Sequence, residues 1–253
     1  MRKAAANVTL AGTANVDLYK IGRACEIFSA DGRKNCIDKG IPVKNLILMA
    51  GNIGSGKTSL TQLLGKELNW ATAYESVTDN PYISDFYRDM HTWSFHLQIY
   101  FLGNRSLQHR EMARLESSAI IDRSIYEDAH IFVRALREMG NISERDFNAY
   151  LKVYEQIVPQ LPKPDLLIYL RAPVPVLMRR IQARARNIET GISLEYLQLL
   201  DGFYEDWIKN FELCPVLTIR SDDLDFVHKP EHLQQVIDYI HNRLVGKDEI
   251  LLS

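Results

Sequence analysis

From residue 43 onward, short apolar runs alternate with longer stretches in which apolar residues recur at helical spacing. The runs have the length of buried strands, and they predict strands at Leu46–Ala50, Ala71–Tyr74, Ala119–Asp122, Leu166–Leu170 and Val216–Ile219. The longer stretches predict helices at Ser59–Leu68, His91–Leu115, Glu127–Glu138, Ser143–Val158, Val174–Ala185, Leu194–Asn210 and Glu231–Leu244. Strands that alternate with helices are typical of a parallel sheet covered on both faces. We therefore expect an α/β fold with a five-stranded parallel sheet flanked by helices.

Residues 1–42 do not follow this pattern. They are rich in Ala, Gly and Asn, with a short helical pattern near Val16–Phe28 and a turn at Ser29–Asn35. We therefore divide the chain into an N-terminal extension, residues 1–42, and a larger domain, residues 43–253. The extension is expected either to dock on another subunit and enlarge the assembly, or to cross its own domain as a strap.

The composition narrows the class of protein. With 46% hydrophobic and 25% charged residues, it is ordinary for a globular domain. A net charge of −2 gives no overall field that favours nucleic acid or an anionic membrane. The three cysteines form no C-x-x-C pair and indicate reduced thiols. No apolar stretch has the length of a membrane span, and no continuous apolar segment marks a secretory signal. We expect a cytoplasmic protein; the lack of acidic residues in the first sixteen leaves a mitochondrial location as the alternative.

Residues 51–58 form a complete G-x-x-x-x-G-K-[ST] phosphate-binding loop between a predicted strand and a predicted helix. Gly51 and Gly56 allow backbone N–H groups to surround phosphate oxygens, and the helix dipole adds positive charge there. Lys57 is placed to reach the β- and γ-phosphates and Thr58 to hold Mg²⁺. The alternative, a Gly-rich turn without a ligand, is disfavoured because strand, spacing, Lys and Thr are all present. The expected loop contacts are Gly51, Asn52, Ile53, Gly54, Ser55, Gly56, Lys57, Thr58 and Ser59.

Two further segments suit the phosphate side. Asp122 ends a predicted strand, where a carboxylate beside such a loop usually holds Mg²⁺, and Arg123 can contact a phosphate. Asp122 could also cap the following helix, which is compatible with that role. Arg180, Arg184 and Arg186 lie at a basic helix end that by itself is typical of a solvated surface. Beside a phosphate-binding loop we favour a lid that supplies positive charge to phosphoryl transfer.

Other residues suit an acceptor with a planar base. Glu75 follows the second predicted strand and could accept the proton of a substrate hydroxyl. Gln98 and Arg105 are seven residues apart on one helix face, and each can make two hydrogen bonds to a planar edge. Asp128 and Phe132 pair a carboxylate with an aromatic ring at i, i+4. Alone, each of these residues is more often a core or surface residue; together they predict a slot that stacks a base.

Taken together, these residues resemble the deoxynucleoside kinases of the deoxycytidine, deoxyguanosine and deoxyadenosine kinase type. The matching segments are Gly51–Thr58, Glu75, Asp79–Tyr82, Phe86–Tyr87, Gln98–Arg105, Asp122–Asp128, Lys163–Asp165 and Arg180–Glu189. They occur in the family's order, and two of them, Asn80–Tyr82 and Ser124–Asp128, are most similar to the bacterial deoxyadenosine/deoxyguanosine branch. The resemblance implies a P-loop kinase fold with an arginine-rich lid, ATP as donor, and a homo-oligomer that is a dimer at least. A tetramer is possible through residues 1–42.

The same resemblance implies roles for individual residues. Glu75 is implied as the general base on the sugar 5′-hydroxyl, assisted by Arg123, with Lys57 acting on the phosphates. The other implied contacts are Tyr87 and Glu189 for the 3′-hydroxyl, Gln98, Arg105, Asp128 and Phe132 for the base, Thr58 and Asp122 for Mg²⁺, Arg180, Arg184 and Arg186 in the lid, and Asp225 and Phe226 near the donor's base. Ile188 stands where the family often has a second acidic residue before the lid glycine.

These roles predict ATP-dependent phosphorylation of a deoxynucleoside 5′-hydroxyl. A carboxylate such as Asp128 only accepts hydrogen bonds, so it favours an amine on the base and disfavours thymine. We expect deoxyadenosine first, with deoxyguanosine and deoxycytidine weaker. One alternative is a nucleoside monophosphate kinase, which Glu75 disfavours because it would repel a second phosphate. The other is a non-catalytic kinase-like nucleotide-binding subunit, which the intact Lys57, Glu75 and lid arginines disfavour.

Overall fold

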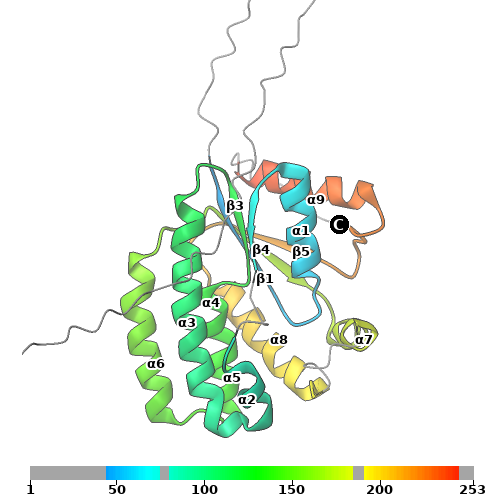
Figure 1. Ribbon diagram of the computed structural model, residues 1–253. Coiled ribbons are helices and arrows are strands. Elements are labelled where there is room, and N and C mark those ends of the chain that lie inside the picture. The colour runs from blue at the N-terminus through cyan, green and yellow to red at the C-terminus, as the bar shows by residue number, and fades with distance from the viewer. Residues whose placement is uncertain (1–43, 75–79, 185–190, 245–253) are drawn as a thin grey trace, which may run out of the picture. The chain divides into compact units, whose positions relative to one another are not determined.

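The sheet of the computed structural model has five strands (Figure 1), β1 (Leu46–Gly51), β2 (Ala71–Ala73), β3 (Ala119–Asp122), β4 (Leu166–Arg171) and β5 (Val216–Arg220). The structure describes residues 44–74, 80–184 and 191–244, all within one unit, Ile41–Ser253. The strand order is β2-β3-β1-β4-β5 and every pair is parallel. The predicted five-stranded parallel sheet is confirmed. The extension 1–42, with both of its suggested roles, lies outside the described residues.

The two faces of the sheet bury alternate side chains of β1, as a strand requires. Leu46, Leu48 and Ala50 pack into the larger core, toward α3 (Met90–Arg114), α6 (Glu144–Ile157) and α8 (Leu194–Lys209). Ile47 and Met49 pack into a second core with α1 (Lys57–Leu68) and α9 (Pro230–Leu244). Figure 1 shows α1 and α9 on one side of the sheet and α3 and α6 on the other. Burial on both faces explains why the three central strands, β1, β3 and β4, are almost wholly apolar.

Most predicted helices are present within one or two residues of their expected ends. The remaining elements are α2 (Ile83–Arg88), α4 (Ile125–Glu127), a π-helix η1 (Asp128–Phe132), α5 (Val133–Glu138), a 3₁₀-helix η2 (Val158–Gln160) and α7 (Val174–Arg184). The prediction of one regular helix over Glu127–Glu138 was wrong in two respects. The segment begins earlier, because a capping box of Ser124 and Glu127 starts it, and its middle is a π-helix.

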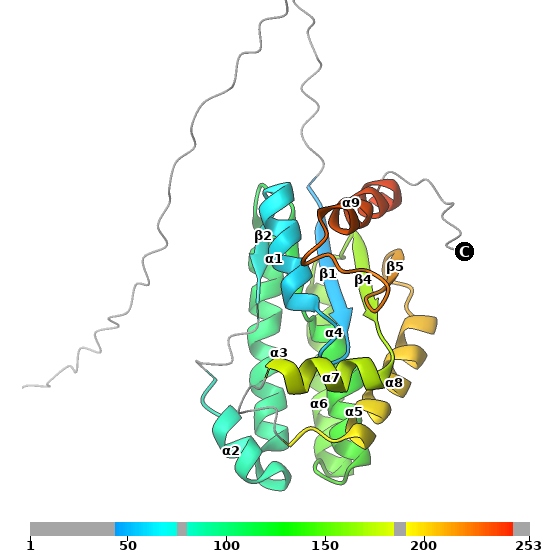
Figure 2. The same cartoon turned by 90° about the vertical axis from the view of Figure 1, so that its right-hand side faces the viewer.

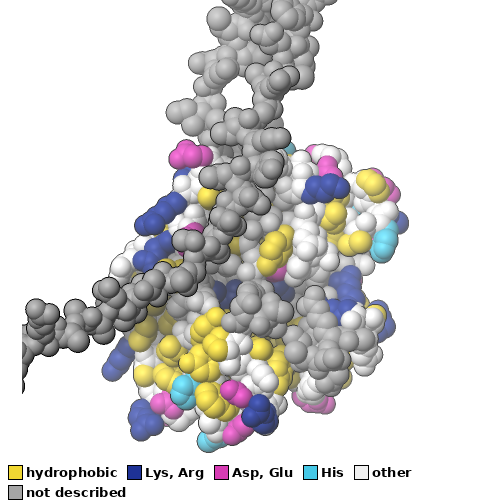
Figure 3. All heavy atoms as spheres, viewed as in Figure 1, with side chains coloured by type: hydrophobic (Ala, Val, Ile, Leu, Met, Phe, Trp, Pro, Cys, Tyr) yellow, Lys and Arg dark blue, Asp and Glu magenta, His cyan; other side chains and the backbone are white. Residues whose placement is uncertain are grey.

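Helix α2 lies outside the elements predicted from sequence. Phe86 anchors it in the core, and Asp89 caps the following α3 by accepting a hydrogen bond from Thr92 N. A hollow of about 290 Å³ on this part of the surface is lined by Tyr82, Phe95, His96, Ile99 and Tyr100. Figure 3 shows hydrophobic side chains gathered over the same region of α2 and α3.

The strand register brings the predicted functional positions to one edge of the sheet. Met49 pairs with Asp122, and Ala73 pairs with Ile121. The phosphate-binding loop, Asp122 and the chain leaving β2 therefore emerge together at the carboxyl ends of the strands, where ligands bind in such sheets. Figure 2 shows α7 crossing near the end of β1. In the described part of the chain no helix has both the length and the apolarity needed to cross a bilayer.

Candidate active site

The phosphate-binding loop has a backbone that its glycines alone allow. Gly51 has φ +148°, and a Cβ there would lie 2.5 Å from the carbonyl oxygen of Leu170. Gly56 has φ +100° and is the N-cap of α1. Because glycine has no side chain, it makes no side-chain capping hydrogen bond. The first N–H groups of a twelve-residue helix therefore lack a side-chain cap. Such a helix end, with its positive dipole, is a site for phosphate oxygens.

Lys57 lies buried beneath this loop. Its Nζ donates hydrogen bonds to Gly51 O at 2.7 Å and to Asn52 O at 3.0 Å. Burial, followed by the charge of Arg123, lowers the pKa of Lys57 to about 8, while Asp122 and Glu127 act in the opposite direction. A phosphate at the loop would offer this ammonium a full negative charge in place of carbonyl dipoles.

Thr58 and Asp122 meet as predicted. Thr58 Oγ1 donates to Asp122 Oδ2 at 2.6 Å, and Asp122 is buried. A hydroxyl and a carboxylate side by side at a phosphate-binding loop match the oxygen ligands that Mg²⁺ takes when phosphates complete its coordination. Elsewhere in the described residues, no cluster of three or more His, Cys, Asp or Glu side chains could hold a metal.

Arg123 has an unusual backbone. Its φ of +69° is rare for a residue other than glycine, and such strain persists only where neighbours enforce it. Here Arg123 N donates to Met49 O at 3.0 Å, and Arg123 O accepts from Arg105 Nη1 at 2.8 Å. The guanidinium lies over the Phe132 ring, 4.3 Å from its centroid. Arg123 therefore contacts Phe132, one of the residues predicted to bind the base.

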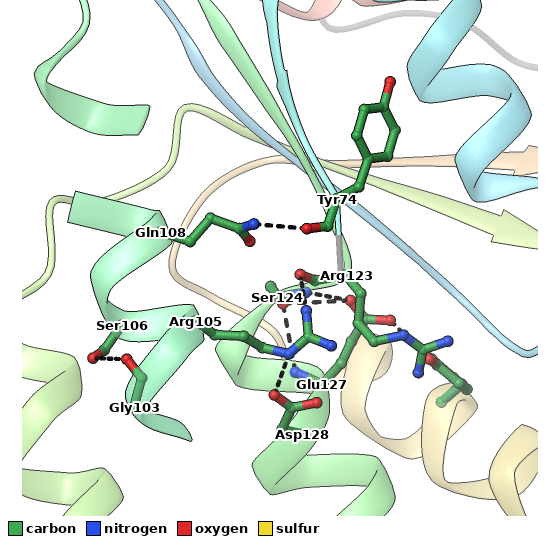
Figure 4. Close-up of polar contacts among 10 residues, drawn as sticks. Tyr74, Gly103, Arg105, Ser106, Gln108, Arg123, Ser124, Glu127 and Asp128 are labelled. Carbon is green, nitrogen blue, oxygen red and sulfur yellow. Dashed lines mark hydrogen bonds and ion pairs between the residues drawn. The ribbon is translucent and has the colours of Figure 1, made fainter. Parts of the chain in front are cut away.

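Three of the predicted base-binding residues, Gln98, Arg105 and Asp128, are buried, and the fourth, Phe132, is half-buried. Arg105 Nε pairs with Asp128 Oδ2 at 2.5 Å, and their side chains are only 5% and 3% exposed. Figure 4 shows this pair between α3 and the η1 segment. Gln98 is buried on the same helix, and its Oε1 has no hydrogen-bond partner among the described residues. A buried amide oxygen without a partner is costly, so it suits a site where a ligand supplies the missing donor.

The lid side is described only up to Arg184, which is exposed at the end of α7. Arg180 donates from Nη2 to Ser221 O at 2.6 Å and from Nη1 to Ser221 Oγ at 3.0 Å. This arrangement ties α7 to the residue after β5. Phe226 lies against the loop, since a Cβ on Gly56 would be 3.3 Å from its ring. Its neighbour Asp225 is exposed and accepts a hydrogen bond from His228 N at 3.1 Å.

A family model described as deoxynucleoside kinase matches residues 47–246 of this chain. The chain belongs to the deoxynucleoside kinase family. It is 38% identical over 202 residues to a deoxyadenosine/deoxycytidine kinase of Bacillus subtilis, covering 79% of this chain and 93% of that protein. It is 38% identical over 192 residues to a deoxyadenosine kinase of Dictyostelium discoideum, covering 76% and 77%. A solved deoxyadenosine kinase from M. mycoides, with the products dCMP and a flexible dCDP bound, matches with a TM-score of 0.70 at 29% identity, covering 78% and 99%.

Four of the residues that sequence analysis assigned to this kinase need separate mention. Glu75, Arg186 and Glu189 lie outside the described residues. Tyr87 is on α2, 42% exposed, with its ring 5.2 Å from that of Phe86. The chain just before Glu75 is held in place, because Gln108 Nε2 donates to Tyr74 O at 2.9 Å (Figure 4).

Sequence analysis missed a group of buried residues behind the kinase's phosphate loop. Glu127 is fully buried and contacts Gly51 N, Ser124 N and the Tyr204 hydroxyl. Asn52 Nδ2 donates to Leu197 O at 3.0 Å, which ties the loop to α8. The Ser-Ile-Tyr-Glu string at 124–127 has capping-box spacing and could have pointed to Glu127. No local pattern marks Tyr204 as its partner.

Proposed function

We propose that this kinase transfers the γ-phosphoryl group of ATP to the 5′-hydroxyl of a deoxynucleoside, with deoxyadenosine as the preferred acceptor. The observation that supports this proposal most directly is the arrangement of two consecutive residues at the end of β3. Asp122 bonds to Thr58 in the phosphate half, and the next residue, Arg123, covers Phe132 in the base half. Two half-sites that meet at consecutive residues suit a reaction between a triphosphate and a nucleoside, because both must be held in one geometry.

In the proposed reaction, the 5′-oxygen bonds to the γ-phosphorus, the bond to the β,γ-bridging oxygen breaks, and ADP leaves. Glu75 takes the hydroxyl proton, and Arg123 stabilises the charge of the incoming oxygen. Lys57 and the N-terminus of α1 hold the phosphates, with Arg180, Arg184 and Arg186 adding charge from the lid. Thr58 and Asp122 would hold Mg²⁺, which neutralises phosphate charge. Tyr87 and Glu189 would bind the 3′-hydroxyl, and Asp225 and Phe226 would border the donor's base.

The preference among bases rests on the buried Arg105–Asp128 pair. Asp128 only accepts hydrogen bonds, so it suits a base edge that offers an amine, whereas Arg105 only donates them. Gln98 can complete the recognition with its unpartnered Oε1. Adenine and cytosine carry such an amine, which agrees with the Bacillus relative being a deoxyadenosine/deoxycytidine kinase and the Dictyostelium relative a deoxyadenosine kinase. Thymine has a carbonyl there and would leave an acceptor unpaired.

A panel of kcat/KM values for four deoxynucleosides tests this proposal. We expect deoxyadenosine to be highest, deoxyguanosine and deoxycytidine lower, and thymidine lower than deoxyadenosine by roughly two orders of magnitude or more. A panel in which thymidine gives the highest value would overturn the base assignment while leaving the kinase activity intact.

Two experiments separate this function from its alternatives. A nucleoside monophosphate kinase would phosphorylate deoxyadenosine monophosphate and not deoxyadenosine, so each is offered separately. A non-catalytic nucleotide-binding protein would show no turnover with any acceptor.

The role of Glu75 as catalytic base is tested by Glu75→Gln. This variant is expected to keep deoxyadenosine binding and lose turnover; unchanged turnover would exclude that role for Glu75.

The assembly and location of this enzyme stay predictions. Family resemblance supports a dimer at least, and deletion of residues 1–40 followed by measurement of mass in solution tests whether the extension enlarges it. Cys214 is a free thiol, in keeping with the expected reducing cytoplasm.

A further inference from the structure

Glu127 is a fully buried acidic residue surrounded by hydrogen-bond donors. Its Oε1 accepts from the Tyr204 hydroxyl at 2.7 Å and from Gly51 N at 3.3 Å. Its Oε2 accepts from Ser124 N at 2.9 Å and, at 3.4 Å, from Ser124 Oγ. A buried carboxylate is costly unless several donors surround it, and this one meets three donor residues. Burial and the neighbouring Glu127 raise the pKa of Tyr204 well above its usual range, so its phenol stays a donor.

These donors belong to parts of the chain far apart in sequence. Gly51 ends β1 and opens the phosphate loop, Ser124 caps α4, and Tyr204 is on α8. The residue that follows Glu127 is Asp128, the predicted base contact, which pairs with Arg105. Figure 4 shows Glu127 beside Ser124 and close to the Arg105–Asp128 pair. A single carboxylate therefore links the start of the phosphate half to the start of the base half.

We propose that Glu127 is a positioning residue that holds the phosphate loop at a fixed distance from the base-binding segment. The role rests on the function proposed above for the phosphate loop and Asp128. Glu127 itself touches neither substrate, since its oxygens are occupied by protein donors. It acts through Gly51 N on one side and through the peptide that continues to Asp128 on the other.

The hydrogen bonds of Glu127 make this role measurable. Glu127→Gln removes the negative charge and leaves the side-chain shape unchanged. One of the two carboxylate oxygens becomes an NH₂ group, which cannot accept a hydrogen bond. That NH₂ group would face either Gly51 N or Ser124 N, so at least one backbone N–H would lose its acceptor.

The test compares Glu127→Gln with Tyr204→Phe in the full-length enzyme. We expect Glu127→Gln to lower kcat/KM for ATP by roughly ten- to a hundredfold, the effect of one lost charge-assisted hydrogen bond. The loss should appear mainly as a higher KM for ATP, because the phosphate loop is the part that Glu127 holds in place. Tyr204→Phe keeps the carboxylate, so we expect a smaller fall in kcat/KM for ATP, of about three- to tenfold.

Controls separate positioning from folding and from the proposed function itself. Ser143 caps α6 by accepting a hydrogen bond from Asp146 N, and it is not among the contacts of Glu127. Ser143→Ala should therefore lower the melting temperature without changing kcat/KM or KM for ATP. If Glu127→Gln keeps both kcat/KM and KM for ATP within about twofold, Glu127 is only structural and the proposal fails. If Glu127→Gln does not fold, unchanged kcat/KM in Tyr204→Phe overturns it. If Lys57→Met also retains turnover, the proposed function fails instead.

Discussion

The phosphate half and the base half of the proposed active site are built differently. The phosphate half is one continuous stretch, Gly51–Thr58, completed by Asp122. The groups expected to bind phosphate are mostly backbone N–H groups at the N-terminus of α1. The base half consists of side chains from separate elements, Gln98 and Arg105 on α3 and Asp128 on η1, and all three are buried.

This difference predicts different responses to substitution. In the phosphate half a side-chain change removes charge, while the backbone that cradles the phosphates stays as the glycines set it. In the base half, Arg105 and Asp128 form a buried ion pair, and Gln98 Oε1 has no hydrogen-bond partner among the described residues. A change there affects substrate binding and the free energy of unfolding together, because a buried partner is left without its counter-charge.

Lys57→Met should have the largest effect on turnover. Removal of a preorganised positive group at the developing charge typically lowers kcat by roughly a hundred- to a thousandfold. The melting temperature of the free enzyme should not fall, because the low pKa of Lys57 shows that its buried charge opposes folding near neutral pH. Lys66→Met, on the exposed last turn of the same helix, is the matched control and should leave both quantities unchanged. A Lys57→Met enzyme with near-normal kcat would show that the phosphate half does not depend on this charge.

Asp128→Asn should reduce both activity and stability. It leaves the buried Arg105 guanidinium without its carboxylate, which typically costs about 3 kcal/mol or more of unfolding free energy. We also expect kcat/KM for deoxyadenosine to fall by roughly ten- to a hundredfold, with less loss for thymidine because the new amide can donate. Denaturant unfolding and the nucleoside panel measure the two effects.

The exposed pair of Arg134 and Asp206 provides the control for that experiment. Its atoms are 3.4 Å apart, with side chains 39% and 58% exposed. Asp206→Asn should cost less than about 1 kcal/mol and leave the nucleoside panel unchanged. Equal costs for the two substitutions would mean that burial does not distinguish the halves as we describe.

Phe132→Leu should have a moderate effect confined to the base half. It removes the ring beneath the Arg123 guanidinium and the surface on which a base would stack, so KM for deoxyadenosine should rise about three- to tenfold. Phe203→Leu removes a similar ring, 4.6 Å from the guanidinium carbon of Arg134, and should leave KM unchanged. If KM for ATP rises instead, Phe132 serves the phosphate half and not the base half.

The smallest expected effect is that of pH on the unmodified enzyme. Only the charged form of Lys57 binds phosphate well, and its pKa is about 8. The value of kcat/KM for ATP should therefore fall by about half between pH 7 and 8 and continue to fall above it. The linked stability has the opposite direction: the unfolded chain binds the proton more tightly, so unfolding free energy rises with pH between about 8 and the ordinary value of 10.5. A flat kcat/KM profile to pH 9 would contradict the Lys57 assignment.

The sequence by itself determined the elements whose physics is local. Apolar runs predicted all five strands, most clearly β1, β3 and β4, because a strand buried on both faces must be almost wholly apolar. The eight residues from Gly51 to Thr58 predicted the phosphate loop, because glycine conformations and the helix N-terminus are encoded within the loop itself. Helix spacing and side-chain chemistry suggested Arg105, Asp128 and Phe132, and the family resemblance gave them roles. The structure pairs Arg105 with Asp128 and places Arg123 over the Phe132 ring.

Only the tertiary structure decided how the halves are joined. The π-helix at Asp128–Phe132, the left-handed backbone of Arg123 and the bond between Glu127 and Tyr204 each depend on contacts between segments distant in sequence. Hydrophobic periodicity records which face of an element is buried but not which polar group it meets there. That pairing is set by the packing of distant segments. Here packing places the buried Glu127 carboxylate between Gly51 N, at the start of the phosphate loop, and the Tyr204 hydroxyl on α8.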